Sequence, residues 1–259
     1  MIGAYFQPGP DGFGPHPEAR GPWADDMLHG RLLGGLAARA FEAELIEPGW
    51  RAARLTVDLF RPAAMAPVTV RTQVVRQGRR IRVADAVMAC GGHDVARATV
   101  VVLAESTEPP GRIWRPDPQP WPDPLTVAWE PDPSEPEPAW IVTPLPGGEF
   151  ESAGQSRVWT RERAGLVEGE PLTPFVRAAM SGDLACPLAN GSDEGLYYIN
   201  GDYTLALGRY PVGEWIGLEA SQQLAADGIS IASSTLVDLG GPFATSTGTS
   251  LARPALPKP

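Results

Sequence analysis

The strongest constraint on this chain is that it repeats its own order of elements. An apolar stretch with helical spacing, residues 28–45, precedes four segments typical of β-strands, with a turn signal at Gly78. A second helical stretch, residues 173–183, precedes four more such segments, with a turn signal at Gly228. Corresponding features lie about 150 residues apart, and an internal period of that size indicates a duplicated domain rather than a solenoid.

The strand segments alternate apolar and polar residues or run in β-branched residues, which favours antiparallel strands joined by short turns. In the first half they read RLTVDLFRP, PVTVRTQVVRQG, RRIRVADAVMACGG and HDVARATVVVLAES. In the second half they read YYINGDYTLALGRYP, GEWIGLEASQQLAADG, ISIASSTLVDLGG and PFATSTGTSLA, preceded by a short strand, WTRERA. The second helix has Thr173 as N-cap and Pro174 at its first position. We therefore expect an α+β fold in which each half wraps an antiparallel sheet around one helix, with one sheet shared and a cleft at the junction.

A connector rich in proline separates the two halves. It spans residues 108–146, between an N-terminal unit at residues 1–107 and a C-terminal unit at residues 147–259. Proline fixes φ and removes a hydrogen-bond donor, so this segment is neither regular helix nor central strand. Its tryptophans lead us to expect that most of it packs on the two units as ordered, extended chain. They are Trp114, Trp121, Trp129 and Trp140.

Charge and composition exclude several classes of protein. The net charge is −10, which opposes binding to a nucleic-acid backbone. No apolar run is long enough for a membrane span, and the N-terminus lacks the pattern of a signal peptide, so we expect a cytoplasmic protein. Cys90 and Cys186 are too few for a disulfide scaffold or a zinc site, and we interpret both as buried hydrophobes. His16 and His93 have no partner by spacing, so we expect no metal and no cofactor.

Several of these segments resemble a known family. HGRLLGGLAARAFE, RLTVDLFRP and RQGRRIRVADAVMACGGHDVARATVVV resemble the first half of the acyl-CoA thioesterase II family. WTRERAGLVEGEPLTPFVRAAMSGDL and YYINGDYTLALGRYPVGEWIGLEAS resemble the second half of related thioesterase-like proteins. The resemblance implies a double hotdog fold, two units of a helix wrapped by antiparallel sheet in one chain. It also implies hydrolysis of an acyl-CoA thioester without a cofactor.

The family's catalytic triad is an aspartate, a threonine and a glutamine that orient the attacking water. The aspartate matches Asp183, whereas Asn200 stands at the threonine position and Thr249 at the glutamine position. Asparagine still donates and accepts hydrogen bonds, but threonine is shorter than glutamine. We expect the three side chains to converge on one cleft.

The residues themselves leave alternatives open for these positions. Asp183 lies on the apolar stripe of the second helix, where a buried carboxylate often has the raised pKa that suits a general base. Alternatively, the helix ends at Gly182 and Asp183 is solvated. Asn200 precedes a glycine and is either a turn residue or the entrance of a strand. Thr249 is either a site residue or simply a β-former.

The first helix offers candidate substrate contacts. His29 and Gly30 lie at its start, where unpaired backbone amides can polarise a carbonyl, although the family usually has glycine at the position of His29. Gly34 and Gly35 each cost the helix roughly 1 kcal/mol relative to alanine, so something approaches the backbone there. The alternatives are tight packing against a strand and room for an acyl chain.

A basic run in the first half is the candidate site for the phosphates of coenzyme A. Arg79, Arg80 and Arg82 lie in an expected strand, and Arg80 and Arg82 are the contacts we predict. A solvated strand face is the alternative.

Two functions from different classes fit these features. The first is hydrolysis of a fatty acyl-CoA by water that Asp183 activates and that Asn200 and Thr249 position. The second is a non-catalytic protein that binds acyl groups or acyl-CoA in a degenerated site. A hydratase is a poor fit because the second half contains no histidine. The edges of hotdog sheets commonly pair, so we expect a homo-oligomer. The length of the acyl chain stays open.

Overall fold

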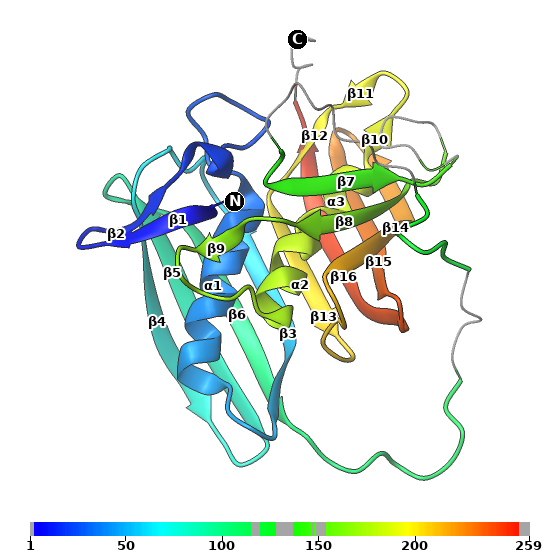
Figure 1. The fold of residues 1–259 in the computed structure, drawn as a ribbon, viewed down its shortest axis with the longest axis horizontal. Helices are drawn as coiled ribbons and strands as arrows, with labels where there is room; N and C mark the ends of the chain where they lie inside the picture. Colours follow the sequence, from blue (N-terminus) through cyan, green and yellow to red (C-terminus); the bar gives the residue numbers. More distant parts are fainter. Residues whose placement is uncertain (1–2, 115–119, 128–136, 147, 149–153, 254–259) are drawn as a thin grey trace.

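The computed structural model describes residues 3–114, 120–127, 137–146, 148 and 154–253. Both halves contain the expected unit, and the two units lie side by side (Figure 1). None of the helices in this part of the chain combines the length and the apolar character needed to cross a bilayer.

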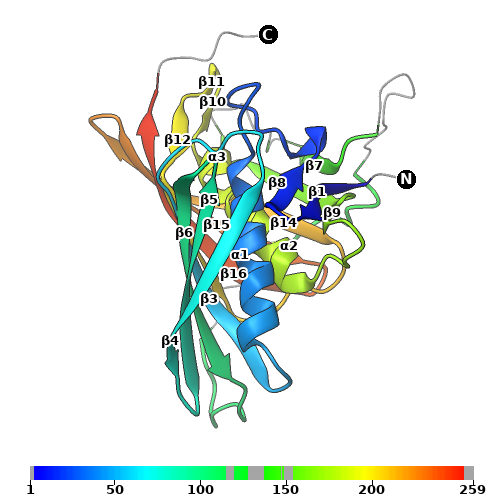
Figure 2. The ribbon, with the colours of Figure 1, turned by 90° about the vertical axis from the view of Figure 1, so that its left-hand side faces the viewer.

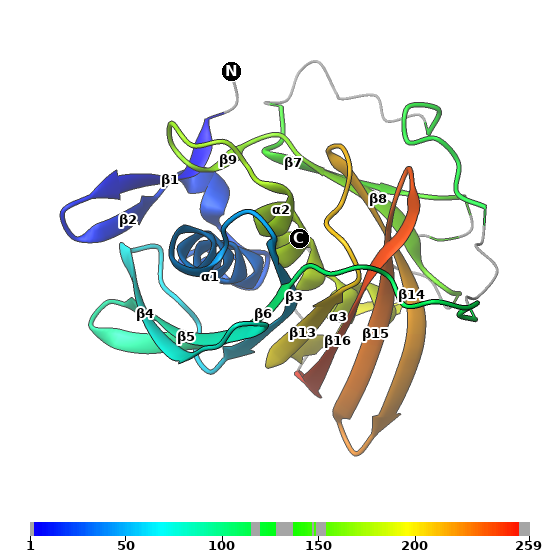
Figure 3. The same cartoon turned by 90° about the horizontal axis from the view of Figure 1, so that it is seen from below.

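The first unit wraps an antiparallel sheet around one helix. Helix α1 (Gly30–Leu45) lies in the concave face of strands β3 to β6, which is clearest when the molecule is seen from below (Figure 3). The strands are β3 (Trp50–Leu59), β4 (Val68–Gln77), β5 (Ile81–Cys90) and β6 (His93–Ala104). Residues from the helix and from the inner face of the sheet form one apolar core that continues into the second unit.

The second unit repeats this order with a shorter helix. Helix α2 (Pro174–Gly182) begins as expected, because the backbone amide of Val176 donates to Oγ1 of Thr173 over 3.2 Å. A short helix that was not predicted, α3 (Ala185–Ala189), follows it. The strands are β13 (Asp202–Leu207), β14 (Trp215–Ala226), β15 (Ile229–Asp238) and β16 (Gly241–Ala252). The turn glycines Gly78 and Gly228 both fall in hairpins, β4–β5 and β14–β15, so the duplication is confirmed.

One continuous sheet joins the units, because β13 pairs antiparallel with β3. The strand order is β7-β8-β14-β15-β16-β13-β3-β6-β5-β4-β2-β1-β9, with β12 on β16. The strands toward its two ends are β7 (Trp140–Pro144), β8 (Arg157–Glu162), β9 (Gly165–Val167), β1 (Ala4–Gly9) and β2 (Gly12–Pro15). The short strand β12 (Tyr198–Asn200) pairs with β16. Strands β10 (Gly191–Ser192) and β11 (Gly195–Leu196) form a separate small hairpin. The pairing is antiparallel except between β1 and β9, which link the start of the chain to the second half.

The connector agrees with the expected packing only in part. Trp121 packs edge to face on Trp159, with ring centroids 4.9 Å apart, and Trp140 begins β7, which pairs with β8. The last part of the connector is therefore a strand of the second unit's sheet. Trp114 is 84% exposed, so the prediction that it covers apolar surface is wrong. Trp129 lies outside the described residues.

Candidate functional site

Asp183 connects the two helices. It is the C-cap of α2, and its residue is 3% exposed because it lies against the first turn of α1. Nδ2 of Asn200 donates to its Oδ1 over 2.7 Å, and the backbone amide of Arg31 also donates to the carboxylate. A Cβ added to Gly30 would lie 3.8 Å from Oδ2. The prediction that Asp183 points inward is confirmed, and Gly30 is in contact with it.

The surroundings of Asp183 suit a general base. Burial raises the pKa of its carboxyl to about 6, against the opposing effects of the Asn200 hydrogen bond and of the charge and backbone amide of Arg31. The desolvation of the charged form outweighs these stabilising contacts. A carboxyl with this pKa is ionised at neutral pH yet accepts a proton more readily than an exposed aspartate.

His29 lies beside this carboxylate as a neutral side chain. It is the N-cap of α1, and its Nδ1 is 3.9 Å from Oδ2 of Asp183. Burial and the charge of Arg31 lower the pKa of the imidazole well below its usual value, so the contact is not a charged ion pair at neutral pH. The ring packs edge to face on Trp140, with centroids 5.8 Å apart.

A buried ionic cluster next to this site was not predicted from the sequence. The guanidinium of Arg31 binds the carboxylate of Glu162 and donates to the hydroxyl of Tyr5 over 2.8 Å, and that hydroxyl donates to Glu162 over 2.7 Å. Arg31 also stacks 4.3 Å from the ring centroid of Trp140. The only signal in the sequence was an arginine within the apolar run of the first helix. The cluster ties the start of α1 to strands β1, β7 and β8, and so holds the backbone amide of Arg31 against Asp183.

Thr249 is not part of this site. It is exposed, whereas its chain neighbours Gly248 and Ser250 are buried, so its side chain lies on the outer face of β16. Its hydroxyl donates to the carboxylate of Asp202, and its amide donates to the same group over 3.1 Å. The expected convergence of three side chains is therefore wrong for Thr249. At the inward position of Gly248, an added Cβ would lie 2.5 Å from Sγ of Cys186, so no side chain fits there.

The two glycines in α1 serve packing. A Cβ on Gly34 would lie 1.8 Å from the hydroxyl of Tyr203, and one on Gly35 would lie 2.9 Å from Cγ of Met180. The Tyr203 hydroxyl donates to the backbone oxygen of Ala179 over 2.8 Å. The alternative of room for an acyl chain at Gly34 and Gly35 is wrong, since side chains of the second unit fill that space.

The basic run lies far from Asp183. Arg82 donates to the backbone oxygen of Leu45 over 2.7 Å, binds Glu47, and lies 3.7 Å from the ring centroid of Trp50. Leu45 ends α1, and 16 residues of helix span roughly 24 Å, so Arg82 and Asp183 are at opposite ends of that helix. Arg80 is exposed in the turn between β4 and β5 rather than in a strand. These positions do not support the prediction that Arg80 and Arg82 both contact the phosphates of a ligand bound at Asp183.

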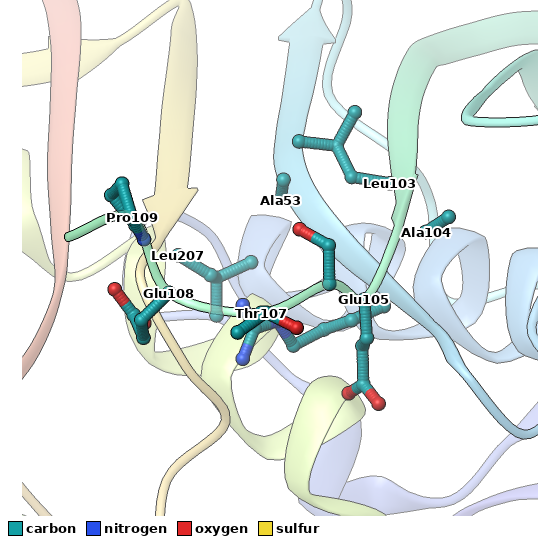
Figure 4. A pocket seen from close by; sticks show the side chains of 10 residues that line it. Ala53, Leu103, Ala104, Glu105, Thr107, Glu108, Pro109 and Leu207 are labelled. Carbon is teal, nitrogen blue, oxygen red and sulfur yellow. The ribbon is translucent and has the colours of Figure 1, made fainter.

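Figure 4 shows an open cavity of about 280 Å³. It lies near Arg82 in the sheet, because its lining residue Leu103 pairs with Ile81. The end of β6, the start of the connector and Leu207 of β13 line it, with Glu105 and Glu108 among its polar groups. Arg51 also lines the cavity, so its charged groups are one guanidinium and two carboxylates, and their net negative charge does not favour the phosphates of coenzyme A.

The residue types that commonly bind metal ions are dispersed over the described part of the chain. Within those residues, no group of three or more histidines, cysteines, aspartates or glutamates is arranged to hold a metal ion. Cys90 and Cys186 are both buried and not joined in a disulfide.

A chain in which one antiparallel sheet wraps two helix-centred units is a double hotdog protein. Residues 19–103 match the model of the acyl-CoA thioesterase N-terminal domain, and residues 104–252 match that of the acyl-CoA thioesterase C-terminal domain. The chain therefore belongs to the acyl-CoA thioesterase family.

Solved structures show the same fold at low identity. An acyl-CoA thioesterase II, TesB2, from Mycobacterium marinum is 19% identical with a TM-score of 0.63, over 87% of this chain and 90% of the other. A conserved protein of unknown function with a hotdog fold from Alicyclobacillus acidocaldarius is 18% identical with a TM-score of 0.72, over 93% and 92%. The tesB protein of Mycobacterium avium subspecies paratuberculosis is 15% identical with a TM-score of 0.65, over 91% of both chains. Comparison with curated proteins gives no significant match.

Proposed function

We propose that this protein hydrolyses the thioester of a fatty acyl-CoA, with Asp183 as the general base. The observation that carries the proposal is the buried carboxylate of Asp183, which lies at the N-terminus of α1 with a pKa raised to about 6. Family membership supports thioester chemistry, and we place the proposed reaction in the cytoplasm.

The proposed reaction needs water as its only co-reactant. Asp183 takes a proton from water as the water oxygen attacks the thioester carbonyl. The tetrahedral intermediate collapses by breaking the C–S bond, which gives the free acid and the thiol of coenzyme A, and the proton held by Asp183 neutralises the leaving thiolate. Each turnover therefore returns the carboxylate to its starting state.

Carbonyl polarisation is assigned to the first turn of α1. The amide of His29 donates to Ala19 over 2.9 Å, that of Arg31 to Asp183, and that of Leu32 to the backbone oxygen of His29 over 3.0 Å. The remaining backbone amide of this turn is that of Gly30, and we assign it as the donor to the developing oxyanion.

Asn200 takes the orienting role of the family's threonine. Its amide donates to Oδ1 of Asp183, which fixes the orientation of the carboxylate. Thr249 faces away, so the proposed mechanism uses a dyad in place of a triad.

A non-catalytic protein that binds acyl-CoA is the second candidate. Two observations favour it: Asp183 is 3% exposed, and β16 supplies no amide to replace the family's glutamine, because Thr249 faces outward. In this case a substrate analogue binds at the start of α1 but is not cleaved.

The test is a panel of acyl-CoA esters of increasing chain length, with release of free thiol as the readout. Hydrolysis by the wild type, at a rate that Asn200→Ala lowers, supports the proposed thioesterase activity. Saturable binding without thiol release by the wild type supports the binding protein. Neither binding nor release with any ester contradicts both candidates.

A further inference from the structure

Helix α2 carries a buried arginine that the proposed mechanism does not use. Arg177 is 8% exposed, and its Nη1 is buried without a hydrogen-bond partner among the described residues. Burial lowers the pKa of this guanidinium, but an arginine stays charged at neutral pH. A buried cation without a hydrogen-bonded partner is costly, so the surroundings of Arg177 favour an anionic ligand.

Two ion pairs next to α2 already use the nearby carboxylates. The guanidinium of Arg161 lies 2.6 Å from the carboxylate of Glu214, and the guanidinium of Arg31 binds that of Glu162. Arg161 is directly paired with Trp215, so the end of β8 and the start of β14 bring both carboxylates to one end of these strands. Each carboxylate therefore has a cationic partner of its own.

Arg177 is close to both pairs but belongs to neither. The charges of Glu214, Glu162 and Arg161 act on its guanidinium, yet within the described ranges no ion pair includes it. Together with Arg31, the partner of Glu162, these groups are three guanidiniums and two carboxylates, which leaves one positive charge. The cluster also lacks acceptors, because Nε of Arg31 and Nε of Arg161 are buried without partners in the same described residues.

A second polar side chain lies on the same face of α2. The helix packs beside α1 (Figure 2), and Ser181 is one turn beyond Arg177. Ser181 is 3% exposed, and its hydroxyl can donate to a ligand that Arg177 binds. Asp183 is six residues beyond Arg177, roughly 9 Å along the helix axis, so the two sites are distinct.

A carboxylate fits this cluster better than a phosphate. One negative charge balances the surplus, and the two oxygens of a carboxylate match the paired N–H groups of a guanidinium. A phosphate dianion would place a second negative charge beside Glu162 and Glu214. The low exposure of Arg177 favours a small ligand.

We propose that Arg177 and Ser181 form a binding site for a small carboxylate, between α2 and the paired ends of β8 and β14. The carboxylate accepts hydrogen bonds from the guanidinium and from the hydroxyl, and it supplies the negative charge that the cluster lacks. A ligand that binds only the folded chain stabilises it. The inference does not depend on thioester hydrolysis, because binding alone is measured.

The test is the melting temperature of the full chain at pH 7, as sodium acetate replaces sodium chloride at constant ionic strength. We expect acetate to raise the Tm of the wild type along a saturating curve, and phosphate to raise it less. Arg177→Met keeps an unbranched apolar side chain but removes the guanidinium, so the acetate effect should be lost. Arg54→Met is the matched control, since Arg54 is exposed on β3 in the other unit, and it should respond as the wild type does.

Ser181→Ala keeps the proposal testable if Arg177→Met does not fold. It removes one donor and should raise the apparent Kd for acetate roughly fivefold. A wild type whose Tm does not respond to acetate overturns the proposal, whatever the variants do. So does an acetate effect that Arg177→Met retains, one that phosphate reproduces in full, or an apparent Kd that Ser181→Ala leaves unchanged.

Discussion

The side-chain amide of Asn200 donates a hydrogen bond of 2.7 Å to the carboxylate of Asp183, across 17 residues of sequence. Asp183 ends α2, and Asn200 ends β12, a three-residue strand that pairs with β16. The contact therefore joins the helix end to the sheet within the second unit, beside the first turn of α1. This pair is the core of the proposed active site.

Removal of the Asn200 amide should weaken catalysis without unfolding the protein. A hydrogen bond to a charged group contributes about 1.5–3 kcal/mol, so we expect Asn200→Ala to reduce kcat/KM roughly 10- to 100-fold. Asn200→Thr restores a donor of the kind the family uses and should recover part of the rate. Steady-state hydrolysis of an acyl-CoA by the three proteins is the measurement. Equal rates for all three would exclude an orienting role for Asn200.

Ionisation of Asp183 should make the folded state less stable as pH rises. Its pKa is about 6 in the folded protein and about 3.9 in an unfolded chain, so the stability it contributes is complete below pH ~4 and is lost as pH rises through 6. Asp183→Asn lacks this titration. Its free energy of unfolding relative to the wild type should therefore rise by roughly 2 kcal/mol between pH 4 and pH 7.5.

Urea denaturation at a series of pH values measures this difference. Asp94→Asn is the control for the loss of a carboxylate, because the Asp94 side chain is 54% exposed. If the difference in free energy of unfolding between Asp183→Asn and the wild type does not change with pH, the carboxyl of Asp183 titrates as that of an ordinary exposed aspartate.

Thr249→Gln should not raise the rate of hydrolysis. The family resemblance alone would predict a gain, but the side chain at this position lies on the outer face of β16 and binds Asp202. A glutamine there has no path to Asp183. Acyl-CoA hydrolysis within twofold of the wild-type rate is the expected result, and a large increase would show that β16 shifts its register in solution.

Gly34→Ala should destabilise the protein although alanine favours helix. The gain in helix propensity is about 1 kcal/mol, whereas a Cβ at 1.8 Å from the Tyr203 hydroxyl forces a shift of two packed units that costs roughly 1–3 kcal/mol or more. We expect a lower Tm than the wild type. Gly3→Ala, where no atom lies within 4 Å of the added Cβ, is the matched control and should melt as the wild type does.

The fold could be predicted from the sequence because its signals are local and repeated. Most strands of the two units show their own alternating or β-branched pattern, and Thr173 with Pro174 marks the start of α2. Because the same order of helix and strands occurs twice, the assignment of elements in one half supports the assignment in the other, and the two together predict a duplicated unit. Helix α3 escaped prediction because five residues are too few to show a period.

The site could be predicted only where a residue's position depends on its own element. Asp183 continues the apolar face of α2, so its inward orientation could be predicted from the sequence. The side on which Thr249 projects depends on the register of β16 against β15 and β13, and a shift of one residue reverses every side chain. The Arg31–Glu162 pair joins residues 131 positions apart, and no local pattern reports such a contact.

Release of coenzyme A by the wild type and by Asp183→Asn tests the central claim most directly. The variant keeps the size and shape of the side chain but removes the base, and it should retain the wild-type circular dichroism spectrum. At pH 8, where Asp183 is ionised, we predict acyl-CoA hydrolysis by the wild type and a rate at least 100-fold lower for Asp183→Asn. Hydrolysis at the same rate by both proteins would contradict the assignment of Asp183 as the catalytic base.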